Sequence, residues 1–152
     1  METRRHVHEE PFSVSPERMF ETLITPSAIR SWWGASKAIV TPKIDGVWIA
    51  TWGDDEDAAD YVSSFKIKAF EPPKRLLLTD GKYQAKSGQP PFELRMTAEF
   101  VIEPWGQGCT LRVINDGFPV DEVADDFYDA CLVGWQNTFE GIRKYFFDNP
   151  NG

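Results

Sequence analysis

The stretch SPERMFETLITPSAIRSWWG, residues 15–34, carries two successive signals for the start of a helix. Ser15 can cap the first helix, and Pro16 suits the first turn because the N–H that proline lacks would have no partner there. Thr25 and Pro26 repeat the same pattern further along the stretch. The stretch therefore predicts two short helices, one directly after the other.

Trp32 and Trp33 close the second of these helices, immediately before Gly34. Burying an indole removes roughly 150–250 Å² of surface from water, and its N–H must still find a hydrogen-bond partner. We therefore expect this pair where an apolar space meets a polar rim. The two side chains either fill a core or line a pocket.

The hydrophobic pattern changes from a helical period to a period of two between Lys37 and Asn115, which is typical of an antiparallel meander. Residues 94–102 alternate most clearly, so one face of the sheet is expected to meet water. A first strand, Val7–Val14, precedes the helices. Five further strands are predicted at Val47–Trp52, Tyr61–Phe70, Arg75–Thr79, Phe92–Glu103 and Cys109–Asn115.

The last segment, Val123–Phe147, predicts one long amphipathic helix. Its apolar stripe recurs three and four residues apart, at Phe127, Cys131, Trp135, Thr138 and Ile142. A curved antiparallel sheet must cover its second face, and only this helix is long and apolar enough to do so. We predict an α+β fold in which the sheet wraps around the C-terminal helix, as a single domain over residues 1–152.

The composition limits the classes of function that the protein can have. Aromatic residues make up 14% of the 152 residues, a load beyond what a small core needs for packing alone. The net charge of −8 disfavours binding to nucleic acid or anionic lipid, because like charges repel. We expect a cytoplasmic protein, since no segment has the pattern of a signal peptide or a membrane span. Cys109 and Cys131 lack the spacing of a zinc site and are predicted to be buried free thiols.

The sequence predicts no catalytic residue, no metal site and no cofactor. His6 and His8 point the same way on a strand, but no cluster of further ligands accompanies them, and an exposed edge strand accounts for them more simply. The acidic run at residues 54–57 lacks the ligand pattern of an EF-hand loop and is read as a solvated turn. No serine or cysteine has an activating base at a readable spacing.

The order of elements and a set of short motifs resemble the helix-grip fold of the START/Bet v 1-like (SRPBCC) superfamily. More narrowly, the chain resembles the branch named after the activator of heat-shock protein 90 ATPase. The motifs are Ser15-Pro16-Glu17 with Phe20, Trp32-Trp33-Gly34, Asp45-Gly46, Glu71-Pro72-Pro73 with Leu76, Gly108-Cys109-Thr110-Leu111, Asp116-Gly117-Phe118 and Gly134-Trp135. The segment from Gly81 to Pro91 departs from the branch's shorter turn and predicts a flexible loop at one end.

The resemblance implies a hydrophobic cavity between sheet and long helix, used for lipids, sterols, polyketides or other small apolar molecules. Ala50 lies between two large indoles on its strand, and from the residues alone both core packing and a cavity remain open there. The side chains predicted to bind a ligand are Trp32, Trp33, Trp48, Trp52, Phe65, Ile67, Leu78, Met96, Phe100, Val113, Asn115, Trp135, Thr138 and Phe139. Asn115, Thr138 and Tyr61 either determine specificity or bond to nearby backbone groups.

Three functions remain open on the sequence. The first is non-enzymatic binding of a small apolar or aromatic molecule in the cavity. The second is an enzyme similar to polyketide cyclases or hydrolases, in which Tyr61, His8 or Asn115 moves a proton. The third, implied by the family branch, is a module that contacts heat-shock protein 90. The oligomeric state is not predicted.

Overall fold

The computed structural model describes residues 2–54, 57, 59–86 and 96–150. Its helices are α1 (Pro16–Ile24), α2 (Pro26–Trp33) and α3 (Asp125–Asp148), with a 3-10 turn at Glu122–Ala124 leading into α3. Its strands are β1 (Thr3–Phe12), β2 (Lys37–Val40), β3 (Val47–Trp52), β4 (Tyr61–Glu71), β5 (Arg75–Ala85), β6 (Met96–Trp105) and β7 (Gly108–Pro119).

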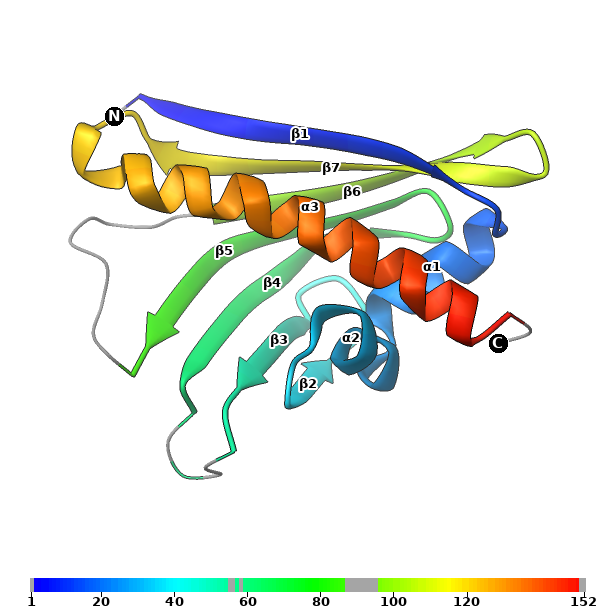
Figure 1. Cartoon of the computed structure of the whole chain (residues 1–152), viewed down its shortest axis with the longest axis horizontal. Helices are drawn as coiled ribbons and strands as arrows, with labels where there is room; N and C mark the ends of the chain where they lie inside the picture. The colour runs from blue at the N-terminus through cyan, green and yellow to red at the C-terminus, as the bar shows by residue number, and fades with distance from the viewer. Residues whose placement is uncertain (1, 55–56, 58, 87–95, 151–152) are drawn as a thin grey trace.

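The strands of the described residues form one sheet in the order β1-β7-β6-β5-β4-β3-β2, and every neighbouring pair is antiparallel. Figure 1 shows that the sheet curves and that α3 runs across one of its faces, with α1 and α2 beside the C-terminal half of α3. The predicted α+β helix-grip architecture is confirmed.

The two short helices form where the sequence predicts them. The backbone N–H of Arg18 donates to Ser15 Oγ at 3.2 Å, and Gly34 ends α2 with a φ of 71°. The predicted side-chain cap by Thr25 is wrong. Its hydroxyl instead donates to the Glu21 carbonyl of α1 at 2.7 Å, because the connection is so short that this side chain still reaches the last turn of α1.

The edge strand and its neighbour are longer than predicted. β1 begins at Thr3 instead of Val7, and β7 continues to Pro119 instead of ending at Asn115. The two strands pair along this whole length, so each supplies the partner that extends the other. Both extensions contain polar residues, so they show no alternation of hydrophobic and polar residues from which a strand could be predicted.

β5 also continues beyond its predicted end at Thr79. Asp80 adopts a φ of 54°, and the register against β6 shifts between Leu78 and Gly81. This bulge breaks the period-two pattern while the strand itself continues to Ala85.

The remaining comparisons concern β2, the strand predicted at Phe92–Glu103 and the loop predicted at Gly81–Pro91. β2, a four-residue strand at Lys37–Val40, is absent from the prediction because so short a segment shows no period. The predicted strand Phe92–Glu103 begins in residues 92–95, which lie outside the described residues, and continues as β6. The predicted loop from Gly81 to Pro91 is strand as far as Ala85, and its part from residue 87 also lies outside the described residues.

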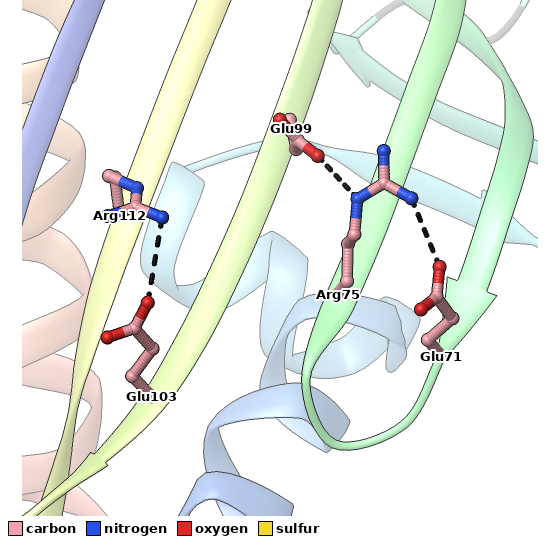
Figure 2. Close-up of polar contacts among 5 residues, drawn as sticks. All are labelled: Glu71, Arg75, Glu99, Glu103 and Arg112. Carbon is pink, nitrogen blue, oxygen red and sulfur yellow. Dashed lines mark hydrogen bonds and ion pairs between the residues drawn. The ribbon is translucent and has the colours of Figure 1, made fainter.

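The face of the sheet away from α3 is polar, as predicted. Figure 2 shows Arg75 of β5 between Glu71 and Glu99, and Arg112 of β7 beside Glu103. The Arg75–Glu71 and Arg112–Glu103 ion pairs measure 3.1 and 3.6 Å. Exposed pairs of this kind contribute little stability each, so the sheet depends mainly on its apolar inner face.

The inner stripe of α3 is packed tightly only along the C-terminal half of the helix. Phe139 and Ile142 are buried in the core, whereas Phe127 and Cys131 on the same stripe are half-buried. None of the helices in the described residues is long and apolar enough to cross a membrane.

Candidate functional site

A cavity of about 550 Å³ lies between the concave face of the sheet and helices α2 and α3. Strands β3 to β7 form its wall on one side, and the N-terminal half of α3 borders it on the other. Its volume falls within the range of small-molecule sites, roughly 300–1,000 Å³.

The structure brings most of the residues predicted to bind a ligand to this cavity. Those that line it are Trp32, Trp33, Trp48, Trp52, Phe65, Leu78, Met96, Phe100, Asn115, Trp135 and Thr138. Ile67, Val113 and Phe139 do not line it and are packed in the buried core instead. Ala50 is likewise buried and does not line the cavity, which agrees with core packing, one of the two interpretations left open by the sequence. Binding of a ligand by the lining residues stays a prediction.

Several lining residues lie outside the predicted set. They are Tyr61, which the sequence suggests only as a possible specificity residue, and Ser63, Gly81, Lys82, Tyr83, Ala98, Phe127, Ala130, Cys131 and Gly134. The bulge in β5 hides Gly81 and Tyr83, because it breaks the alternation that Leu78 begins. Cys131 lies one turn before Trp135 on the apolar stripe of α3, and this spacing is the signal that could have identified it.

The indole of Trp33 lies at the centre of a tryptophan cluster at one end of the cavity. Its ring centroid is 4.8 Å from that of Trp52, 5.4 Å from that of Trp48 and 5.7 Å from that of Trp32. The N–H groups of Trp32 and Trp48 donate to carbonyls in the last turn of α1, each at 2.9 Å. Carbonyls at a helix end lack helical partners, so these indoles satisfy them and are themselves held in place.

Asn115 is a polar side chain in the cavity wall, and only 5% of it is exposed. Its Oδ1 accepts the Nε1–H of Trp135 at 2.8 Å, and its Nδ2 donates to the Thr97 carbonyl at 2.9 Å. Thr138 Oγ1 donates to the Gly134 carbonyl one turn earlier at 2.8 Å. Both polar side chains therefore bond to the protein, and Asn115 also joins α3 to the sheet.

Exposed residues mark the rim of the cavity. The rings of Tyr61 and Tyr83 stack with centroids 5.8 Å apart, and Tyr83 lies 6.1 Å from Phe127 of α3. Tyr61 is 44% exposed and Lys82 is also exposed, so this end meets solvent. Burial raises the pKa of Tyr83, with smaller contributions from Tyr61 and Cys131.

The two histidines are not exposed, contrary to the prediction. β1 is an edge strand, but His6 is only 3% exposed, with its ring centroid 4.0 Å from that of Tyr128 in α3 and 4.8 Å from that of Phe118. In the described part of the chain, both ring nitrogens of His6 lack a hydrogen-bond partner. Within the same residues, the Nε2 of His8 lacks one as well. Burial is the largest cause that lowers the pKa of both imidazoles.

The chemistry available in the lining is limited. Among the residues that the structure describes, no group of three His, Cys, Asp or Glu side chains could hold a metal ion. The described lining contains no carboxylate and no imidazole. Burial raises the pKa of Cys131, which lines the cavity, and of Cys109 to about 11, so both free thiols stay protonated at neutral pH. The arrangement can enclose a molecule, exclude water and offer hydrogen bonds.

The curved sheet gripping a long helix over an apolar cavity defines a helix-grip protein of the START/Bet v 1-like (SRPBCC) superfamily. Residues 13–146 match the family described as "Activator of Hsp90 ATPase homolog 1-like protein", and the chain belongs to that family. The resemblance noted in the sequence is confirmed.

Solved structures from bacteria share the fold. Protein MLL2253 from Mesorhizobium loti is 25% identical, with a TM-score of 0.76 over 95% of this chain and 98% of its own. Protein NE0264 from Nitrosomonas europaea is 16% identical, with a TM-score of 0.74 over 95% of each chain. Protein SA2116 from Staphylococcus aureus, of unknown function, is 12% identical, with a TM-score of 0.77 over 99% of this chain and 98% of its own. No curated protein matches the chain.

Proposed function

We propose that this protein binds a small apolar or aromatic molecule in the cavity between its sheet and α3. The observation that carries the proposal is a cavity of about 550 Å³ walled mainly by aromatic and aliphatic side chains. Transfer of an apolar molecule from water into such a space is favourable.

Hydrogen bonds that hold the indoles of the cavity wall in place support the proposal. Trp32 and Trp48 are held by hydrogen bonds to α1, and Trp135 is held by Asn115. A wall that is ordered before binding loses little conformational entropy when a ligand enters, so more of the contact energy appears as affinity.

Ligand-dependent thermal unfolding tests this function. At a ligand concentration of about 100 times Kd, binding adds about 2.7 kcal/mol to the free energy of unfolding. For a chain of this size that corresponds to a rise in Tm of roughly 5–10 °C. Native mass spectrometry of the same library of lipids and aromatic compounds should detect complexes of one ligand per chain. A library in which no compound raises Tm or forms a complex contradicts the proposal.

The other two functions have weaker support. Proton-transfer catalysis needs an acid or base within hydrogen-bond reach of the substrate, and the described lining offers tyrosines at the rim as its titratable oxygen groups. Contact with heat-shock protein 90 rests on the family description alone, and an ATPase assay with that chaperone tests it directly. The cytoplasmic location stays a prediction.

A further inference from the structure

We propose that the ligand is a neutral aromatic molecule carrying a hydroxyl or carbonyl oxygen, and that the carboxamide of Asn115 recognises this oxygen. The inference rests on the proposed function and adds to it a chemical class of ligand and a specificity-determining residue.

Asn115 has hydrogen-bonding capacity that the protein leaves unused. A carboxamide offers two N–H groups and two acceptor lone pairs. Trp135 uses one lone pair, and the Thr97 carbonyl uses one N–H. No other group in the described residues bonds to the side chain of Asn115, which leaves one N–H and one lone pair of the carboxamide in the cavity wall. A ligand oxygen can accept that N–H, and a ligand hydroxyl can also donate to that lone pair.

The orientation of this carboxamide is determined by its partners. An indole N–H can only donate, so Trp135 must face Oδ1, and the Thr97 carbonyl can only accept, so it must face Nδ2. Since the two partners belong to α3 and β6, rotation of the amide would break both bonds. The free N–H of Asn115 is therefore oriented before a ligand arrives.

The rest of the lining favours a neutral, flat molecule. In the part of the chain that the structure describes, Lys82 is the one lining residue of the Lys, Arg, Asp or Glu type, and it is exposed at the rim. A charged ligand would lose its hydration inside without meeting a counter-ion. Trp33, Phe100 and Trp135 offer ring faces and edges against which an aromatic ligand can pack.

Ser63 is another polar side chain in the lining and supplies a matched control. It lies on β4, whereas Asn115 lies on β7, and its hydroxyl makes no hydrogen bond within the described residues. A free hydroxyl rotates and is not oriented in advance. Replacing Ser63 thus removes a polar group from the same cavity without breaking a hydrogen bond of the protein.

The test compares 2-naphthol with 2-methylnaphthalene, which have the same shape but differ in one hydroxyl. Isothermal titration of wild type, Asn115→Leu and Ser63→Ala gives the ratio of the two Kd values for each protein. We expect Asn115→Leu to shift this ratio about tenfold towards 2-methylnaphthalene, the size of one good hydrogen bond, and Ser63→Ala to shift it less than about twofold. 2-Naphthoate should bind wild type at least about tenfold more weakly than 2-naphthol.

A readout on wild type keeps the test decisive if Asn115→Leu does not fold. The side-chain N–H signals of Asn115 in an NMR spectrum should move further downfield with 2-naphthol, which accepts a hydrogen bond, than with 2-methylnaphthalene, which acts through its ring current alone. An unchanged ratio in a folded Asn115→Leu, equal NMR responses to both probes, or tight binding of 2-naphthoate would each overturn the inference and leave the proposed function standing. Failure of both neutral probes to bind wild type would instead contradict the proposed function.

Discussion

Two imidazoles on β1, His6 buried and His8 half-buried, have a pKa that the fold lowers. His6 and His8 face α3 and lack hydrogen-bond partners within the described residues for three of their four ring nitrogens. Burial lowers the pKa of His6 most, and the charge of His8 lowers it next; Asp129 opposes this, and Arg4 and the backbone of Tyr128 have smaller effects in opposite directions. The net effect is a pKa below the ordinary value of 6.5, so the folded protein favours neutral imidazole.

We expect the protein to lose stability as the pH falls from about 7 to 5. Because the folded pKa values of His6 and His8 are lowered, the unfolded chain binds protons first as the pH drops below about 6.5, and protons then favour unfolding. Stability is fully present above the unfolded pKa and declines below it. Chemical denaturation at a series of pH values measures this slope.

The variant His6→Phe provides the comparison for that slope. A phenyl ring can occupy the site between the rings of Phe118 and Tyr128 and takes up no proton. The decline in unfolding free energy between about pH 7 and 5 should therefore be smaller in the variant than in wild type. Equal slopes would show that His6 titrates as it does in the unfolded chain.

Single residues also show what the sequence could and could not predict. Asn115 is recognisable because it ends the apolar row of Leu111 and Val113. Ser63 is not, because a serine in a strand is equally common on a wet face. The parity of His6 with Phe12 indicates an inward direction, but burial of an edge strand depends on α3, which lies more than a hundred residues away in sequence.

Helix α3 illustrates how an element's packing decides the effect of a substitution. A Cβ at Gly141 would lie 2.2 Å from the carbonyl oxygen of Trp32 in α2, whereas a Cβ at Gly134 would meet nothing within 4 Å. Glycine at 141 thus permits the close approach of α2 and α3. At position 134, packing does not require a glycine.

The substitutions Gly134→Ala and Gly141→Ala should therefore have opposite effects. Alanine has the higher helix propensity, so Gly134→Ala should raise the free energy of unfolding by about 0.5–1 kcal/mol. Gly141→Ala should lower it by about 1–3 kcal/mol, because α2 must move away from α3. Urea denaturation of the two variants beside wild type measures both values, and destabilisation of equal size in each would contradict this account.

Elements were predictable where a local signal determines them. The cap by Ser15, the helix end at Gly34 and the stripe of α3 each depend on residues close in sequence. β2 and the second half of β5 depend on pairing with neighbouring strands instead, and the bulge at Asp80 removes the alternation on which the prediction of β5 relied.

The whole molecule differs from an ordinary sheet-and-helix sandwich in leaving space between its layers. The curved sheet and the C-terminal half of α3 close the core around Phe139 and Ile142, while the N-terminal half of α3 borders the cavity. The sequence alone could not show whether the space between sheet and α3 is a filled core or an open cavity, since the same apolar rows are compatible with either. The difference depends on the distance between layers, which no local pattern records.

The variant Ala98→Leu tests that distinction on the complete fold. Ala98 is buried in β6, opposite Leu78 and Asn115 on the neighbouring strands, and lines the cavity. If the space beside it is free, leucine buries additional apolar surface and the free energy of unfolding stays level or rises by up to about 2 kcal/mol. A packed core would instead lose about 1–3 kcal/mol through strain.

The same variant should weaken ligand binding at least about tenfold, because the larger side chain occupies part of the volume that a ligand needs. Thermal unfolding with and without a compound that stabilises wild type measures both effects in one experiment. A destabilised Ala98→Leu that binds as well as wild type would show that Ala98 faces packed side chains and that the ligand lies elsewhere. A stable variant that no longer responds to the ligand is the outcome expected from a cavity that is open before binding.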